Sequence, residues 1–255
     1  MTEDSGDDAF DTFKRVAREL LKQVDEYINT HPERLAFEPL RSTEALQALN
    51  GSIWKSRAAR DRQKQVTLIG TIATQLMLEN GWALFHVDGD RTWADRSSSE
   101  NVQKFRPLVW EKVRLRILME LEQREKQTAN PTTPSEREAR ANQRMTRLKQ
   151  VVPFYSMEAW LFQNTREAVR LCAEHYRNTD VERFNAWEQD RTALDEVLEP
   201  KKKVCLGAKH NLELASQGFP ARAVHDAGKS FAAVVQELSQ DEELTEALSR
   251  TYAYE

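Results

Sequence analysis

The chain has 255 residues, of which 40% are hydrophobic and 31% charged, and its formal net charge at pH 7 is -4. This length corresponds to one domain of ordinary size or to two small ones. The mean hydropathy of -0.71 is too polar for a membrane protein, and the sequence has no run of the roughly 18 apolar residues that a spanning helix needs. The acidic start MTEDSGDD lacks the apolar core of a signal peptide, which predicts a cytoplasmic protein.

Helices should dominate the fold, because the chain contains only 8 glycines and a turn-rich all-β fold would need more. Apolar residues recur at intervals of three and four along several segments, which is typical of amphipathic helices. In chain order, we expect helices over 10–28, 43–49, 66–77, 102–121, 157–175, 181–198, 208–216, 230–238 and 241–255. The helix over 66–77 is expected to end in a left-handed cap at Asn80-Gly81, and the proline-containing stretch 128–135 resembles a linker.

Short apolar runs interrupt this helical pattern and predict a small buried sheet. The run 82–87 directly follows a helix, as expected for a strand of a parallel sheet that helices cover on both faces. Further runs occupy 35–40 and 151–155, a last strand is expected over 221–224, and 201–206 is a loop or an edge strand. The sequence therefore predicts a helix-rich α/β fold with a small parallel sheet.

Three units are expected along the chain. These are a helical amino-terminal extension over 1–32, an α/β domain over 33–239 and an acidic carboxyl-terminal helix over 240–255.

Asp88 and Asp90 give the strongest chemical signal, since they follow the predicted strand 82–87 with one glycine between them. Ligands of open α/β sheets bind outside the carboxyl ends of the strands. Two carboxylates at such an end can share a hard cation, and oxygen ligands suit Mg²⁺ or Mn²⁺. The alternative is a β-hairpin, because Asp-Gly is also a common turn signal.

Two further carboxylates stand near apolar runs. Glu158 lies one turn into a helix that follows the run 151–155, where the helix dipole alone also favours an acidic residue. Glu38 lies inside the run 35–40, where a buried charge would need a metal or a partner such as Arg34 or Arg41. Carboxylates that follow three separate runs could converge on one edge of the sheet.

This arrangement resembles the TOPRIM domain of topoisomerases, primases and OLD-type nucleases, which carries a first-strand glutamate and a later D-x-D motif. The segments VVPFYSMEAWLFQN, GAKHNLELA and AGKSFAAVVQEL are similar to parts of small TOPRIM-like proteins associated with prokaryotic defence. The resemblance implies a Rossmann-like fold in which Glu38, or alternatively Glu44, is the first-strand glutamate. It also implies that Asp88 and Asp90 form the acidic pair, that Glu158 is a further acidic position and that Lys209 is a late lysine.

The resemblance implies a divalent-metal-dependent nuclease that cuts DNA or RNA, with Mg²⁺ or Mn²⁺ at Glu38, Asp88, Asp90 and Glu158. The catalytic residues would be those four carboxylates together with Lys209, which would stabilise charge on the phosphate. The resemblance further implies anti-phage defence beside a partner ATPase, and it leaves a homo-oligomer open. The alternative function is a non-catalytic interaction subunit that docks through its amphipathic helices.

Other metal chemistry is not expected from the remaining residues. Cys172 and Cys205 are too few for a disulfide framework or a four-cysteine zinc site, and the five histidines show no metal-ligand spacing. Basic stretches over 55–64, 137–149 and 201–203 could contact phosphates, although charge runs usually form solvated faces.

Overall fold

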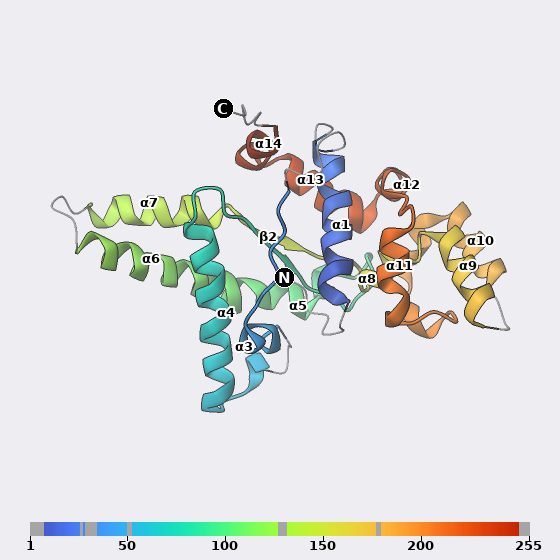
Figure 1. Cartoon of the computed structure of the whole chain (residues 1–255), viewed down its shortest axis with the longest axis horizontal. Helices are drawn as coiled ribbons and strands as arrows, with labels where there is room; N and C mark the ends of the chain where they lie inside the picture. Colours follow the sequence, from blue (N-terminus) through green and yellow to red (C-terminus); the bar gives the residue numbers. More distant parts are fainter. Residues whose placement is uncertain are drawn as a thin grey trace.

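Two short strands lie at the centre of a largely helical molecule (Figure 1). A computed structural model describes residues 8–25, 28, 35–49, 53–126, 132–176 and 180–249. Helix α4 (Ala59–Met77) and the pair α6 (Glu111–Glu125) and α7 (Pro134–Met145) extend to one side of the strands, and α9 (Thr165–His175) and α10 (Val181–Gln189) lie at the opposite end. The expected dominance of helices is confirmed.

The sheet consists of two parallel strands, β1 (Ala83–His86) and β2 (Leu148–Val151), with Ala83 opposite Leu148. Backbone hydrogen bonds continue the pairing beyond the strands, from Gly89 N to Pro153 O at 3.0 Å and from Asp90 N to Tyr155 O at 3.0 Å. The predicted strand over 82–87 and the small parallel sheet are therefore confirmed. The hairpin interpretation of Asp88-Gly89 is wrong, because β1 pairs with a distant strand that runs parallel to it.

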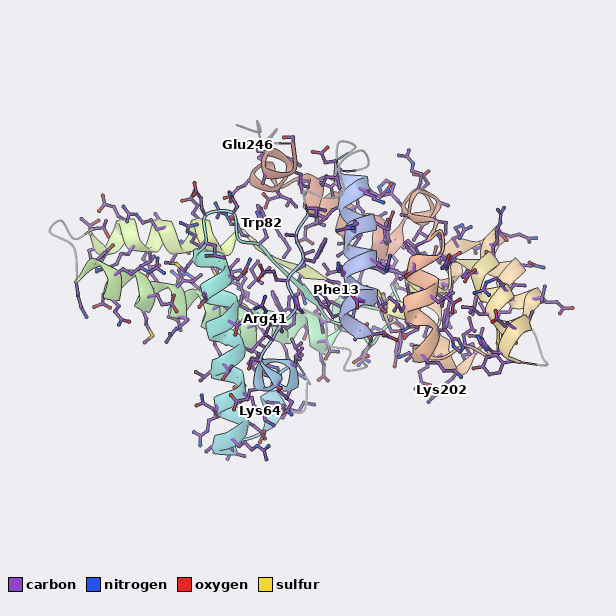
Figure 2. The ribbon with its side chains drawn as sticks, viewed as in Figure 1. Phe13, Arg41, Lys64, Trp82, Lys202 and Glu246 are labelled. Carbon is purple, nitrogen blue, oxygen red and sulfur yellow. A yellow bond between two sulfur atoms is a disulfide. The ribbon has the colours of Figure 1, made fainter. Side chains whose placement is uncertain are left out.

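One hydrophobic cluster covers the sheet on the side of helix α1 (Ala9–Val24), whose buried face includes Val16, Leu20 and Leu21. This helix packs against α11 (Asn211–Ser216), α12 (Ala221–Ala227) and α13 (Lys229–Ser239). In its first half, α1 carries Phe13 (Figure 2). The ring of Phe13 stacks on the buried ring of His86 with 5.3 Å between the ring centroids. The amino-terminal helix thus contributes directly to the core beside the sheet.

A second cluster forms around α4, which buries Leu68, Ile72 and Leu76. Helices α3 (Thr43–Gln47) and α6 pack against α4, and α7 lies beside α6. Helix α7 begins with a capping box in which Thr133 and Glu136 satisfy each other's backbone amides. Helix α5 (Glu100–Phe105) continues into α6 through a π-helical turn over Arg106–Trp110, so the predicted helix 102–121 forms with a local widening.

The remaining helices follow β2. Helix α8 (Met157–Leu161) starts a few residues after this strand, and α14 (Glu242–Ser249) lies near the end of the chain. Ion pairs from Lys149 to Asp241 and from Arg147 to Glu243 hold the start of α14 to β2. Within the described ranges, no helix combines the length and the apolar character that a bilayer crossing requires.

Several element predictions are wrong. Residues 35–42 contain no strand, so Glu38 is not on a first strand, and the expected last strand over 221–224 is helix α12. The helix expected over 157–175 is divided into α8 and α9 by a turn at 162–164. Residues 128–131 of the expected linker and residues 250–255 of the acidic end lie outside the described residues, and Pro134 already begins α7.

The end of α4 also differs from the expectation. Gly81 is not in the left-handed region, and a Cβ atom there would collide with the carbonyl oxygen of Gln75. A glycine is therefore required for close approach of the backbone and not for a left-handed cap.

Candidate functional site

The carboxyl edge of the sheet brings the chain after β1 next to the chain after β2. The close approach depends on Gly89, since a Cβ atom at this position would lie 2.5 Å from the ring of Phe154. Asp88 and Asp90 stand on either side of this glycine, and the backbone amide of Asp90 donates at 3.0 Å to the backbone oxygen of Tyr155, in the segment after β2. Burial, followed by the charges of Asp90, Glu199 and Asp88, raises the pKa of Tyr155.

Asp88 joins the two strand ends through its carboxylate. Its Oδ1 atom accepts a hydrogen bond from the backbone amide of Met157 at 3.0 Å and lies 3.1 Å from His86 Nε2. Because an ionised carboxylate only accepts, this geometry requires the hydrogen of His86 on Nε2. Asp88 therefore holds the start of α8 against the end of β1, immediately beside Glu158.

Asp90 is positioned by its backbone and by Asn101 of α5. Its φ of 52° is in the left-handed region, which aspartate tolerates better than most residues. Asn101 Nδ2 donates to Asp90 Oδ2 at 2.7 Å and to the backbone oxygen of Asp88 at 3.0 Å. Partial burial of the carboxyl group, followed by the charge of Asp88, raises the pKa of Asp90 above its ordinary value. The two aspartates are thus electrostatically coupled.

A cavity of about 560 Å³ opens beside Asp90. Its volume lies in the usual range for small-molecule sites. Aromatic side chains of Trp54, Phe85 and Phe105 form one part of its wall. The polar part of the lining consists of Lys55, Asp90, Arg91, Glu100, Asn101 and Lys104. An aromatic wall next to a charged edge is suited to a ligand that carries both a ring and an anionic group.

Three basic residues, Lys55, Arg91 and Lys104, line the polar end of this cavity. Lys104 pairs with Glu100, and Arg91 Nη1 donates to the backbone oxygen of Asp90 at 2.7 Å. The hydrogen bond and charge of Lys104, followed by the charge of Lys55, lower the pKa of Glu100. The cavity therefore presents more positive than negative charge close to the Asp88–Asp90 pair, although the whole chain is acidic.

Glu158 occupies a separate, buried ion pair. Only 1% of its side chain is exposed, and its Oε1 atom accepts from Lys201 Nζ at 2.8 Å and from Asn211 Nδ2 at 2.7 Å. Its Oε2 atom accepts from Ser156 Oγ at 2.7 Å. These donors neutralise the buried charge, which the structure thus explains without a metal.

The other predicted residues lie away from the cavity lining. Glu38 is exposed in the loop over 35–42, and Glu44 on α3 accepts from Thr67 Oγ1 at 3.1 Å. Lys209 is exposed, with its ammonium group 5.6 Å from the centre of the Tyr176 ring. The structure therefore brings Asp88 and Asp90 together, whereas Glu158, Glu38 and Lys209 do not line the cavity.

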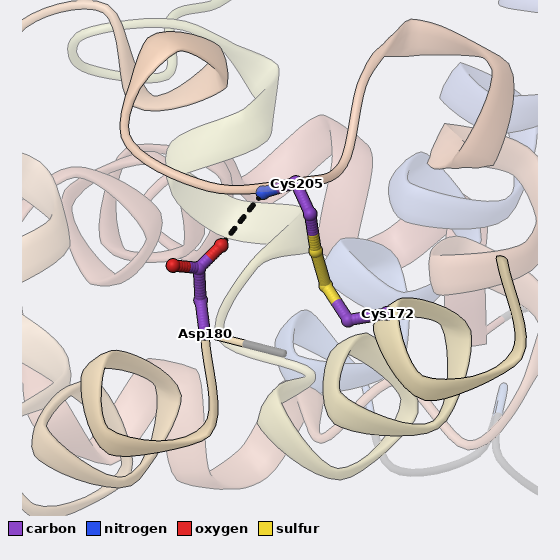
Figure 3. A group of neighbouring side chains, drawn as sticks. All are labelled: Cys172, Asp180 and Cys205. Atoms are coloured by element: carbon purple, nitrogen blue, oxygen red, sulfur yellow. Dashed lines mark hydrogen bonds between the residues drawn. A yellow bond between two sulfur atoms is a disulfide. The ribbon is translucent and has the colours of Figure 1, made fainter. Parts of the chain in front are cut away.

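The densest group of metal-ligating side chains in the described ranges is one that the sequence did not predict. The ligand atoms of Cys172, Asp180 and Cys205 all lie within 4.8 Å of one another (Figure 3). No three of the predicted carboxylates are this close within the same ranges. A cation at the carboxyl edge would therefore be held by the Asp88–Asp90 pair together with water.

Sequence reasoning also missed Asn101, Trp54 and Lys201. Asn101 and Trp54 come from separate elements that only the tertiary fold brings to the cavity, and neither belongs to a motif. Lys201 was visible as part of the basic stretch 201–203, but its pairing with Glu158 depends on the turn that carries it.

Comparisons of this chain with protein-family models, with curated proteins and with solved structures found no match. The resemblance to TOPRIM proteins thus stays a prediction from short sequence segments.

Proposed function

We propose that this protein is a divalent-metal-dependent nuclease whose active site is the cavity beside Asp90. The observation that carries the proposal is the coupled pair Asp88 and Asp90 at the carboxyl edge of a parallel sheet, next to a cavity edged by cations. Ligand sites of open α/β sheets occur at this edge. Through the TOPRIM resemblance, the proposal extends to an anti-phage role beside a partner ATPase.

The donor set at the edge fits Mg²⁺ or Mn²⁺. The negative charge of Asp88 raises the pKa of Asp90. A bound cation would offset the repulsion between the two carboxylates, so the pair favours cation binding. Mg²⁺ commonly binds one or two carboxylates and keeps several waters, so it needs no larger protein cage. When bound, the ion would polarise the scissile phosphate and lower the pKa of a bound water.

The protein's own residues would bind and orient the nucleic acid. Lys55, Arg91 and Lys104 supply positive charge for the phosphates, and the aromatic wall offers Trp54 and Phe105 for stacking of a base. Asn101 fixes the Asp90 carboxylate through its hydrogen bond. A single-stranded substrate is favoured, because an unpaired base can enter a cavity of this size.

Incubation of the purified full chain with labelled single-stranded DNA and RNA, with and without Mg²⁺ or Mn²⁺, tests the proposal. We expect metal-dependent cleavage that Asp88→Asn and Asp90→Asn both reduce strongly. The matched control is Asp11→Asn, which removes an exposed aspartate from the first turn of α1 and should cleave like the wild type. Absence of cleavage by the wild type on every substrate, or equal cleavage by all four proteins, contradicts the proposal.

A second candidate function, a non-catalytic interaction subunit, is favoured by an exposed apolar pair on α6. Leu115 and Met119 lie one turn apart and are 55% and 61% exposed. Since α6 and α7 project away from the sheet (Figure 1), a second copy of the chain could pack on this face. Light scattering over a range of protein concentrations should then show self-association of the wild type that Met119→Glu abolishes. If the wild type and the Met119→Glu variant are both monomeric at all concentrations, this candidate is contradicted.

A further inference from the structure

The residues Cys172, Asp180 and Cys205 come from three separate segments and meet at one point (Figure 3). Cys172 is buried on α9, Asp180 immediately precedes α10, and Cys205 lies in the loop after Pro200–Lys202. The two cysteines form a disulfide with their Cα atoms 6.2 Å apart. Asp180 Oδ2 accepts from the backbone amide of Cys205 at 2.8 Å.

Asp180 adds a carboxylate to the two sulfur atoms. A disulfide carries no charge, so the carboxylate is tolerated beside it. After reduction, the carboxylate and the two thiol groups would face one another within the span of a single metal site. A divalent cation attracts all three groups at once when the thiols release their protons.

The chemical type of these ligands points to zinc. Zn²⁺ binds cysteine thiolates at about 2.3 Å and carboxylate oxygens at about 2.0–2.2 Å, usually with four ligands in a tetrahedron. The three ligand atoms already lie within 4.8 Å of one another, so small side-chain rotations would place them around one ion. These three protein ligands leave the fourth position of a tetrahedron to water.

We propose that, when the disulfide is reduced, Cys172, Cys205 and Asp180 bind one Zn²⁺ ion. Reduction by a dithiol transfers two electrons and two protons to the disulfide, which gives two thiols and leaves the dithiol oxidised to its own disulfide. Binding of Zn²⁺ then releases the two thiol protons to solvent. Disulfide and metal are thus alternative links between the same three segments.

Either link would hold the loop that supplies the partner of Glu158. Lys201 lies four residues before Cys205 and forms the ion pair with the buried Glu158 carboxylate. Reduced protein without metal would lose the link between this loop and α9. This inference is independent of the proposed nuclease activity.

Zinc binding by the full chain tests the proposal. The protein is reduced with a water-soluble phosphine, freed of reductant under argon, and titrated with ZnCl₂ against a chromophoric chelator. We expect one Zn²⁺ per chain for the reduced protein and none for the oxidised protein. Cobalt titration should show thiolate-to-metal charge-transfer absorption in the reduced protein only.

Variants separate the three ligands from the rest of the surface. Cys205→Ser should weaken zinc binding by about 100-fold or more, and Asp180→Asn by about 10-fold. Asparagine keeps an oxygen acceptor for the amide of Cys205, so the fold near the loop should persist. The matched control is Glu182→Gln, an exposed acidic residue in the first turn of α10, which should bind zinc like the wild type.

Equal zinc affinity of the oxidised and reduced proteins overturns the proposal, as does equal affinity of Asp180→Asn and Glu182→Gln. If a cysteine variant fails to fold, thiol alkylation of the reduced wild type is measured in its place. Zinc should then slow alkylation of both thiols in the reduced protein, and unchanged alkylation rates also overturn the proposal.

Discussion

Asp195 is a buried polar residue whose environment is set by specific partners. It is 1% exposed in the 3-10 helix Arg191–Glu196, accepts a hydrogen bond from Ser230 Oγ, and Ser230 accepts from Trp160 Nε1 at 2.6 Å. Burial raises the pKa of Asp195 to about 7, against the opposing effects of the Ser230 hydrogen bond and the Lys229 charge. The carboxyl group therefore titrates near neutral pH.

This shift predicts a pH dependence of stability. Between the ordinary aspartate pKa of 3.8 and about 7, the folded chain holds a proton on Asp195 that the unfolded chain releases. The free energy of unfolding should thus fall as the pH rises through this window, by up to about 4 kcal/mol, and this contribution should be constant above it. Urea unfolding of the wild type and of Asp195→Asn at pH 5 and pH 8 measures it. The variant should lack this part of the pH dependence, and an identical dependence in both proteins contradicts the assignment.

The ion pair of Glu158 predicts unequal effects of two neighbouring lysines. Lys201→Ala would leave a carboxylate that is 1% exposed without its cation, so it should lower the free energy of unfolding by about 1–3 kcal/mol. Lys202 (Figure 2) pairs with the exposed Glu199, and its replacement by alanine should cost less than about 1 kcal/mol. Chemical unfolding of both variants compares the two, and equal losses would contradict the structural role of Lys201.

The elements were predictable where the apolar pattern was long or continuous. Strand β1 followed from its uninterrupted apolar run, and α1 from seven residues at helical spacing. Strand β2 has the sequence LKQV, which contains no continuous apolar run. The apolar pattern therefore predicts the second strand over 151–155, a few residues after the true start of β2. The break between α8 and α9 depends on tertiary contacts, since Asn164 donates to Leu214 O and to Gln217 O at 2.9 Å.

The same distinction applies to the candidate site. Asp88 and Asp90 were predictable, because both directly follow a recognisable strand. The role of Asn101 was not, since nothing local distinguishes it from other polar residues, whereas Lys55 was visible as the first residue of the basic stretch 55–64. Glu158 follows an apolar run as the pattern indicated, yet its environment is set by Lys201 and Asn211 from distant segments.

Two glycines, Gly70 within α4 and Gly81 between α4 and β1, predict opposite effects of an alanine substitution. Gly70 lies within α4, and a Cβ atom there meets nothing within 4 Å, so Gly70→Ala should raise the free energy of unfolding by about 0.5–1 kcal/mol. Gly81→Ala would drive a methyl group into the Gln75 carbonyl and should destabilise by about 2 kcal/mol or more. Thermal unfolding compares the two, and a change of the same sign in both would contradict the described packing before β1.

The whole molecule is acidic, yet its candidate site is edged by cations. The net charge of -4 disfavours strong general binding to nucleic acid, whereas Lys55, Arg91 and Lys104 give the cavity a local positive edge. The proposed activity therefore depends on contacts at one place and not on the overall field of the protein.

This local electrostatic contact predicts the salt dependence of binding. The affinity for a single-stranded oligonucleotide should fall with salt, and Lys55→Gln should reduce the slope of log K against log salt by about 0.7. Lys126→Gln, on the exposed end of α6, should leave the slope unchanged. Fluorescence anisotropy at several salt concentrations measures both slopes. Equal slopes for Lys55→Gln and Lys126→Gln would remove Lys55 from the interface.

We propose that Asp90 and the cavity beside it form a metal-dependent nuclease site. The most direct measurement is the single-turnover rate of oligonucleotide cleavage by the wild type and by Asp90→Asn at saturating Mn²⁺. We expect a rate lower by about 100-fold or more in the variant, because the loss of one of the two carboxylates would displace the ion that polarises the phosphate. Equal rates in the two proteins, or no cleavage by the wild type, would contradict it.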